Sequence, residues 1–447
     1  MELLTYPTEF GRNRGNLPSL PIINLFAENA EPKGNVVLQS RPGLELFRTL
    51  GTDPIRYVYS EPGVFNQDLF ALSGDKLYRG AALLGTVDGD GPVSMDSFSD
   101  TTFLSAGNSL WKYNGTTLTT IAFPNSSSTV KVVVGASRLI VIEKDSQTIY
   151  WSEPLTASID ALNFAQAENS PDRLLDMLFI GDTLLLFGEA TVEFWTIQSS
   201  DPNIPFAPIV GRVFSKGIKN TGAMTKLGSG WAWVTDSNQI CVNSPENIIS
   251  TREIETDIED AGSAYLWNFF LDSIEFLAVR VGNKTHVFSL PTQTWSEFQT
   301  YGLSNWEANS YSNGYFGSAN TGRILVWSAD YNDGSELERR FRVWYPLNMQ
   351  TEIIDNLFMR ANSGRTPYLV GEYQNPRVEM RISRDGGNTW SDWKTSTMGY
   401  TGQYRRQIRW LSQGIVSYPG GLVEFRITDP TPFRVSSVTV NEPYGGY

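Results

Sequence analysis

The sequence predicts an all-β protein in which a β-propeller of six or seven blades is followed by a C-terminal β-sandwich. Three observations lead to this prediction. Short apolar runs separated by Gly- and Asn-containing turns recur through residues 69–327. From residue 339 onward, apolar and charged side chains alternate. The 39 Gly and 23 Pro are scattered between the apolar runs, as in a protein with many tight turns.

Each unit of the repeat consists of a short apolar strand, a turn and a second strand that closes on an aromatic residue or valine. The turns hold pairs such as Gly74-Asp75 and Gly107-Asn108, which tolerate the positive φ of tight hairpins. The closing residues are Tyr78, Trp111, Tyr150, Phe194, Val242, Phe288 and Trp327, at intervals of 33, 39, 44, 48, 46 and 39 residues. Because a four-stranded propeller blade takes roughly 40 to 50 residues, residues 35–338 are predicted to form the propeller.

The segment before the repeats is expected to close the ring, since a propeller pairs strands from the two ends of its repeat region. Asn35–Phe47 is a plausible closing strand pair, with Pro42-Gly43 as its turn. Residues 1–34, rich in Pro, Asn and Gly, are expected to form an extended N-terminal arm that packs on a neighbouring subunit or on another domain. The Pro-containing connection Ser200–Asn220 is either a contact site or a crossing between blades.

Residues 339–447 are predicted to form the β-sandwich. Alternation of apolar and charged residues at period two gives each strand one buried and one solvated face. Clusters of turn residues separate these runs, as in other sandwiches. The predicted strands are Ile353–Arg360, Val378–Ser383, Tyr404–Trp410, Leu422–Thr428 and Phe433–Val440.

The net charge of −13 is unevenly distributed. Residues 339–447 hold 14 Lys and Arg against 9 Asp and Glu, a net of +5, which leaves −18 for residues 1–338. This asymmetry indicates either two regions that face different partners or a solvated acidic surface. An acidic body binds nucleic acid poorly, because affinity for phosphates comes mainly from clustered Lys and Arg. It is suited instead to a conduit to which DNA does not adhere.

Composition also argues against catalysis, metals and cofactors. The single cysteine, Cys241, and the single histidine, His286, exclude an internal disulfide and a Cys/His metal cluster. Neither a phosphate-binding loop nor a dinucleotide fingerprint is present. The acidic run 251–260 is expected to be a solvated loop or short helix, although a glycosidase carboxylate pair stays open. We therefore expect no catalytic, cofactor-binding or metal residues. With no signal peptide and no membrane-length apolar run, we expect a soluble protein made in the cytoplasm.

The sharpest local motif lies at residues 383–390. Ser383, Asp385, Gly387, Thr389 and Trp390 resemble the Asp-box of sialidase-type propellers, a hairpin in which Asp and Ser side chains satisfy backbone groups of the turn. We expect a structural role for this hairpin. A sialidase would also need three arginines converging on a carboxylate, a tyrosine nucleophile and a helping glutamate.

A second set of candidate residues consists of Arg405, Arg406 and Arg409. If they lie on one strand, Arg405 and Arg409 point to one face and Arg406 to the other. They are candidates for an interface with an acidic partner or DNA, with an ordinary solvated face as the alternative.

Several segments resemble the packaged-DNA stabilisation, or tail nozzle, proteins of short-tailed bacteriophages. The matching segments are 21–28, 38–44, 76–85, 91–95, 191–195, 216–218, 380–390, 402–405 and 425–430. The resemblance implies a non-enzymatic virion tail protein that forms a hexameric ring below the portal and its adaptor. It also implies a needle or plug and tailspikes or fibres as partners, with DNA passing without sequence-specific binding and no insertion into a membrane. From the uneven charge we hypothesise that the acidic propeller region faces the lumen and that the basic sandwich grips a neighbouring protein. The alternative is a glycan-binding or sialidase-like propeller.

Overall fold

The computed structural model describes residues 2–3, 21–30, 35–98, 100–167, 170–198, 204–346, 351–417 and 420–441. Contacts divide the chain into two compact units. The propeller unit comprises Leu46–Gly282 and Glu307–Val326. The sandwich unit comprises Met1–Glu45, Asn283–Trp306 and Trp327–Tyr447. Each unit is therefore built from segments that lie far apart in the sequence.

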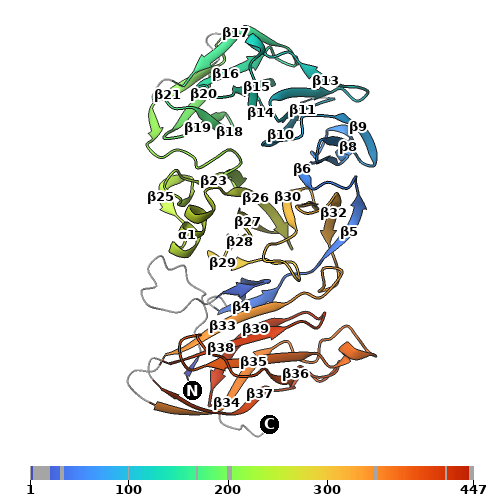
Figure 1. The fold of residues 1–447 in the computed structure, drawn as a ribbon, viewed down its shortest axis with the longest axis vertical. Helices are drawn as coiled ribbons and strands as arrows, with labels where there is room; N and C mark the ends of the chain where they lie inside the picture. Colours follow the sequence, from blue (N-terminus) through green and yellow to red (C-terminus); the bar gives the residue numbers. More distant parts are fainter. Residues whose placement is uncertain are drawn as a thin grey trace. The chain divides into compact units, whose positions relative to one another are not determined.

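Seven strands form the inner ring of the propeller unit in the described part of the chain. They contact one another in chain order and the last contacts the first, which closes the ring. In Figure 1 their sheets follow one another around this ring. The seven strands are β6 (Ile55–Tyr59), β10 (Val93–Phe98), β14 (Thr129–Gly135), β18 (Leu174–Ile180), β22 (Met224–Leu227), β26 (Tyr265–Leu271) and β30 (Ala308–Ser312). The unit is thus a seven-bladed propeller, the upper of the two blade numbers expected.

Outer strands follow each inner strand antiparallel and in chain order. The first three blades add β7 (Phe70–Ser73), β8 (Lys76–Arg79) and β9 (Ala82–Thr86); β11 (Thr101–Ala106), β12 (Ser109–Tyr113) and β13 (Leu118–Ile121); and β15 (Arg138–Glu143), β16 (Thr148–Ser152) and β17 (Ile159–Gln166). The next three add β19 (Thr183–Gly188), β20 (Val192–Ile197) and β21 (Phe206–Phe214); β23 (Gly230–Val234), β24 (Ile240–Val242) and β25 (Ser244–Ile248); and β27 (Ile274–Val281). Apolar residues such as Ile140, Met177 and Leu184 pack between neighbouring blades and form the core.

The seventh blade is completed by a strand from before the first blade. It contains β30, β31 (Tyr315–Ser318) and β32 (Arg323–Trp327), and its fourth strand is β5 (Leu44–Thr49). The Leu50 N–H donates to the Gly322 carbonyl at 2.6 Å. A Cβ on Gly322 would lie 2.3 Å from the Leu50 oxygen, so this closure requires glycine. The second half of the predicted closing segment therefore closes the ring.

The first half of the predicted closing segment Asn35–Phe47 does not take part in closing the ring. β4 (Asn35–Ser40) pairs with β3 (Leu25–Ala30) and with β39 (Arg434–Val440) in the sandwich unit. Pro42-Gly43 is not a hairpin turn, because the Gly43 N–H donates to Asp330 and its carbonyl accepts from Ser328. The expectation of one closing strand pair over 35–47 was wrong.

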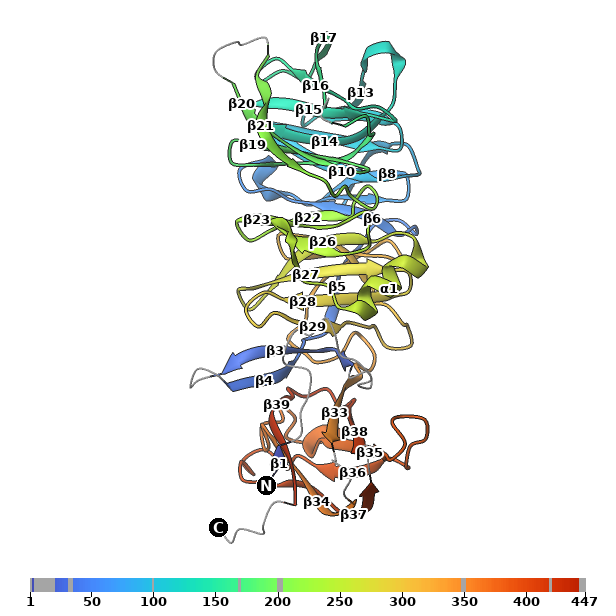
Figure 2. The same cartoon turned by 90° about the vertical axis from the view of Figure 1, so that its left-hand side faces the viewer.

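The sandwich unit contains two sheets. One has the order β3-β4-β39-β34-β37, with β34 at Thr351–Ala361 and β37 at Ile408–Ser417, and β1 (Glu2–Leu3) also pairs with β39. The other runs through β28, β29, β2, β33, β38, β35 and β36, the last four of which lie side by side in Figure 2. Their bounds are Lys284–Ser289, Thr294–Glu297, Ile22–Ile23, Arg339–Pro346, Gly420–Ile427, Arg377–Ser383 and Lys394–Thr397. Phe341, Trp410 and Phe425 pack in the core between the sheets.

Part of the predicted N-terminal arm is therefore strand. Residues 22–23 and 25–30 form β2 and β3, while residues 4–20 and 31–34 lie outside the described residues.

The described chain has one α-helix, α1 (Arg252–Ala261), and short 3₁₀ turns at Phe65–Gln67, Pro124–Ser126 and Glu372–Gln374. The Thr251 hydroxyl caps α1 by accepting from the Ile254 N–H, and Gly262, at φ 71°, ends it. Ile254 and Ile258 are buried, so the helix packs through one apolar stripe. Of the two structures expected for the acidic run 251–260, the short helix is the one that forms.

Candidate partner interface

The motif at residues 383–390 forms a hairpin closed by its own side chains. The Ser383 hydroxyl donates to Asp385 Oδ1 at 2.8 Å and accepts from the Gly387 N–H at 2.8 Å. Asp385 also accepts from the Thr389 N–H at 2.9 Å and the Thr389 hydroxyl at 2.6 Å. These bonds, that of the Thr389 hydroxyl first, lower the pKa of Asp385 to about 2. Gly387 adopts a φ of 102°, and its carbonyl accepts from the Trp390 indole N–H at 3.1 Å.

The hairpin and the segment after it hold two indole rings over a row of arginines. The guanidinium of Arg381 lies 4.7 Å from the centre of the Trp390 ring and 4.5 Å from that of Trp393. Arg342 lies 5.1 Å from Trp390, and Arg426 lies 4.0 Å from Trp393. The hairpin therefore positions aromatic surface over the cationic face of the sheet β33-β38-β35.

These arginines bind a carboxylate of the protein itself. Glu424 on β38 is fully buried, and it lies 2.7 Å from Arg342 and 3.9 Å from Arg340. It also accepts from Arg381 on the opposite neighbouring strand. The three arginines that converge on a carboxylate in this unit are thus used internally.

The Gly-containing loops 362–376 and 398–407 interlock, and we call them together the sandwich tip. The Gly402 N–H donates to the Gly364 carbonyl at 3.1 Å, and the Thr401 hydroxyl donates to the Thr366 carbonyl at 2.8 Å. A Cβ on Gly364, which has a φ of 69°, would lie 2.5 Å from the backbone of Gln403. The two loops therefore pack backbone to backbone.

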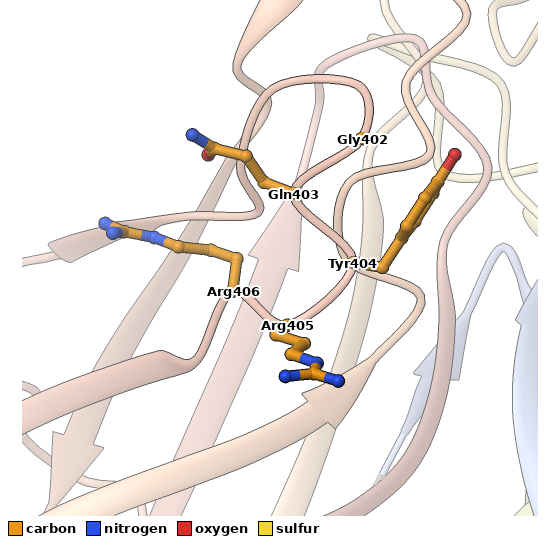
Figure 3. A pocket seen from close by; sticks show the side chains of 5 residues that line it. All are labelled: Gly402, Gln403, Tyr404, Arg405 and Arg406. Carbon is orange, nitrogen blue, oxygen red and sulfur yellow. The ribbon is translucent and has the colours of Figure 1, made fainter. Parts of the chain in front are cut away.

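The surface of the sandwich tip is apolar and cationic. Leu369, Val370 and Tyr404 are 74, 81 and 66% exposed. Arg405 is exposed, and Arg406, also exposed, donates to the Thr397 hydroxyl at 3.1 Å. Residues 402–406 line a hollow of about 400 Å³. Figure 3 shows Gln403 and Arg406 extending to one side of this loop, Tyr404 to the other and Arg405 below them.

Contrary to the expectation, the three candidate arginines do not lie on one strand. β37 begins at Ile408, and Arg405 and Arg406 lie in the turn before it. The turn forms because the Arg406 N–H donates to Gln403 and the Ser363 hydroxyl binds the Arg406 carbonyl. Arg409 lies on β37, half-buried, with its guanidinium 5.0 Å from the Phe358 ring. The expected common face of Arg405 and Arg409 was wrong.

Sequence reasoning missed the other residues of the tip, namely Arg365, Leu369, Val370, Tyr400 and Tyr404. The Arg365 guanidinium lies 6.0 Å from the Tyr404 ring, although the two come from different loops. One signal was available in the sequence. Leu369-Val370 is an apolar pair outside any alternating run, and such a pair in a loop indicates a contact surface.

Comparisons with known proteins identify the family. Residues 13–328 match a family model described as bacteriophage P22 Gp10, β-propeller, and residues 340–442 match one described as bacteriophage P22 Gp10, β-sandwich. The chain belongs to the P22 Gp10 family. Membership of this family places the chain among structural proteins of the phage virion tail rather than among enzymes. It agrees with the predicted fold class and with the family that the sequence resembles.

A curated relative, the tail hub protein gp10 of Salmonella phage P22, is 22% identical over 245 residues, which cover 49% of this chain and 52% of the relative. The match thus spans about half the length of that relative. Among solved structures, YCF48 from Cyanidioschyzon merolae has a TM-score of 0.41 at 12% identity, covering 64% of this chain and 98% of that one. The β-propeller domain of Cps50 (Swd1) from Myceliophteria thermophila has a TM-score of 0.41 at 9% identity, covering 64% and 99%.

The remaining candidate residues of this family member lie in strands or outside the described chain. Cys241 is buried in β24, and His286 is buried in β28 with its ring 6.4 Å from that of Trp295. The described residues contain no group of three potential metal ligands and no helix long and apolar enough to cross a membrane. Of the Pro-containing connection 200–220, residues 200–203 lie outside the described residues, and residues 206–214 form β21.

Proposed function

We propose that this chain is a subunit of the tail hub of a short-tailed phage. Several copies form a ring, expected to be hexameric, that continues the DNA channel below the portal and adaptor, retains packaged DNA and conducts it during ejection. One observation carries the proposal. Both the propeller region, 13–328, and the sandwich region, 340–442, match parts of one phage protein, and the relative that bears its name is a tail hub protein.

The centre of the propeller supports a channel between copies rather than through one copy. Lys131 on β14 forms an ion pair with Asp176 on β18 at 2.9 Å. Burial raises the pKa of Tyr57 on β6, which also feels the charges of Lys131, Asp96 and Asp176. Side chains of the first four blades thus interact near the inner strands, where a small propeller has little space. A passage for duplex DNA then requires a closed ring of several chains.

The charge distribution supports the orientation of each subunit in that ring. Residues 1–338 carry a net charge of −18, and an acidic lumen repels phosphates and prevents DNA from adhering to the wall. The sandwich, with a net charge of +5 over residues 339–447, faces neighbouring proteins. The partners implied are the adaptor above the ring, a needle or plug, and tailspikes or fibres, with no sequence-specific contact to DNA.

Phage particles that lack this chain test the proposal. We expect heads that fill with DNA and then lose it, measured as the fraction of genome protected from nuclease in purified particles. Wild-type particles imaged by electron microscopy should carry a ring of this protein below the adaptor. Particles without the chain that keep their DNA and a complete tail would refute the proposal.

The glycan-binding alternative gains no support from the arginines of the sandwich. A sialoside site needs three arginines directed at the ligand carboxylate, whereas Arg340, Arg342 and Arg381 are directed at buried Glu424. Specific binding on a glycan array would revive this alternative.

A further inference from the structure

The sandwich tip has the composition of a protein-binding surface. It exposes Tyr404, Leu369 and Val370 beside Arg365 and Arg405. Aromatic residues and arginine are enriched in the centres of interfaces, where they contribute most of the binding energy. The bonds between the two loops hold this surface in one conformation, so a partner does not have to order it on binding.

The charge of the tip selects an acidic partner. Arg365, Arg405 and Arg406 are exposed. The one acid of these loops, Glu372, lies 3.5 Å from Arg377 and is thereby partly neutralised. Residues 1–338 of the same chain carry a net charge of −18. A second copy of the chain therefore supplies the complementary charge.

Helix α1 carries acids where a helix tolerates them least. Glu259 and Asp260 are exposed in its last turn, which contains no basic residue. The carbonyls at a helix C-terminus already form the negative end of the helix dipole, so two carboxylates there are unfavourable in the isolated subunit. Arginines from a partner would neutralise them and hydrogen-bond the last carbonyls. Tyr265, four residues after the helix, is 51% exposed and offers aromatic surface as well.

We propose that the sandwich tip of one copy docks on the C-terminal end of α1 in a second copy. This inference rests on the proposed assembly of several copies and names the two surfaces that join them. Because the surfaces differ, the contact is head-to-tail, the kind of interface that generates a closed ring.

Sedimentation of the full chain at low and high salt tests the contact. We expect the wild type to self-associate, and the association to weaken with salt because the interface is charged. Arg405→Glu/Arg406→Glu and Glu259→Lys/Asp260→Lys should each weaken self-association about tenfold or more. A chain that combines all four substitutions should regain association, because the charges are exchanged rather than removed. Lys226→Glu reverses an exposed cation outside both surfaces and serves as the matched control.

Each outcome decides the inference. A wild type that stays monomeric, or an arginine variant that associates like the wild type, overturns it. If both double variants lose self-association and the chain with all four substitutions does not regain it, the sandwich tip and α1 do not contact each other. An interaction that is independent of protein concentration places the contact within one chain and also overturns it. The function proposed above is judged separately, by DNA retention in particles, so either can fail alone.

Discussion

At the scale of single residues, Glu424 is the acid on which the arginines of the sandwich sheet converge. It is fully buried on β38, between Arg342 on β33 and Arg381 on β35. Trp390 covers both of these arginines, so the ion pairs are shielded from water on that side. A buried charge of this kind is stable only while its partners remain.

We expect Glu424→Gln to lower the free energy of unfolding by roughly 3 to 5 kcal/mol, because the guanidinium groups would lose their buried counter-charge. Urea denaturation monitored by tryptophan fluorescence measures the change. Glu372→Gln is the control, since this acid is 70% exposed beside Arg377, and it should cost no more than about 1 kcal/mol. Equal effects of the two substitutions would contradict this account.

Asp96 is expected to make the propeller less stable as the pH rises, which is the opposite of the usual effect of a carboxyl group. It lies on β10 and accepts from the Val134 N–H on β14 at 2.7 Å, so it joins two neighbouring blades. Burial raises its pKa from 3.8 to about 6. The folded protein therefore holds this proton over a range of pH in which the unfolded chain has released it.

Between about pH 4 and pH 6 the contribution of Asp96 to stability should fall as the pH rises, because ionisation is easier in the unfolded chain. We expect Asp96→Asn to remove this part of the pH dependence. Melting temperatures of both proteins across this range provide the measurement. If the melting temperatures of the wild type and of Asp96→Asn change with pH in the same way, the pKa of Asp96 is not raised in the folded protein.

At the scale of elements, α1 combines a well-formed start with an unfavourable end. Thr251 caps its first turn, and the carboxylate of Glu253 in that turn interacts favourably with the positive end of the helix dipole. Glu259 and Asp260 lie in the last turn, where their carboxylates interact unfavourably with the negative end of the dipole.

We expect Glu259→Lys to raise stability by about 0.3 to 1 kcal/mol, even though it is expected to weaken association between copies. Glu253→Lys, at the other end of the same helix, should have the opposite effect on stability. Thermal denaturation of the two variants compares them directly. A destabilised Glu259→Lys would mean that this carboxylate has a favourable partner within the subunit.

The hairpins were the elements that the sequence predicted best. All seven closing residues identified from the repeat lie on strands, namely β8, β12, β16, β20, β24, β28 and β32. The signal is local, because turn residues such as Gly74, at φ 56°, and Gly107, at φ 62°, fix each hairpin from within a few residues.

Long-range pairings and loop contacts were not predictable in this way. Asn35–Ser40 contains the short apolar run expected of a closing strand, but one of its two partners, β39, lies at the far end of the chain. Tyr404 to Trp410 alternates between apolar and polar residues, but the bond from the Arg406 N–H to the Gln403 carbonyl and that from the Ser363 hydroxyl to the Arg406 carbonyl form a turn in its first residues. The aromatic part of the sandwich tip forms only where two loops contact each other, and a periodic pattern in the sequence does not predict such a contact.

Two outer strands also contain bulges that the repeat does not predict. In β17, Phe164 pairs with Tyr150 and Ile159 with Ser152, so four residues on β17 oppose one on β16. In β21, Val213 pairs with Glu193 and Pro208 with Trp195, so four residues on β21 oppose one on β20. Leu162 and Val210, in these bulges, are 83 and 98% exposed. Such bulges interrupt an edge and prevent pairing with another chain.

At the scale of the whole molecule, the ends of the sequence complete both units. β5 forms the last strand of the seventh blade, and in the sandwich unit β1 and β4 pair with β39. The integrity of the propeller therefore depends on the close approach of Leu50 and Gly322.

We expect Gly322→Ala to destabilise the propeller by about 1 to 3 kcal/mol, because the added methyl group must displace backbone at the point of closure. Gly89→Ala is the matched control, since its nearest neighbour, the Cβ of Asp75, would lie at 3.7 Å, an ordinary contact. Limited proteolysis and urea denaturation report the difference. Equal stability of the two variants would mean that the ring does not depend on this approach.

The position of β5 also makes the speed of translation a variable in folding. Ribosomes add roughly 5 to 20 residues per second, so β5 emerges about 15 to 55 seconds before its partner β32 is synthesised. β4 waits longer still, for a partner close to the end of the chain. During this interval the nascent chain presents apolar strands without their neighbours, so a host that elongates quickly, or holds such segments on chaperones, should yield more native protein than a slow one.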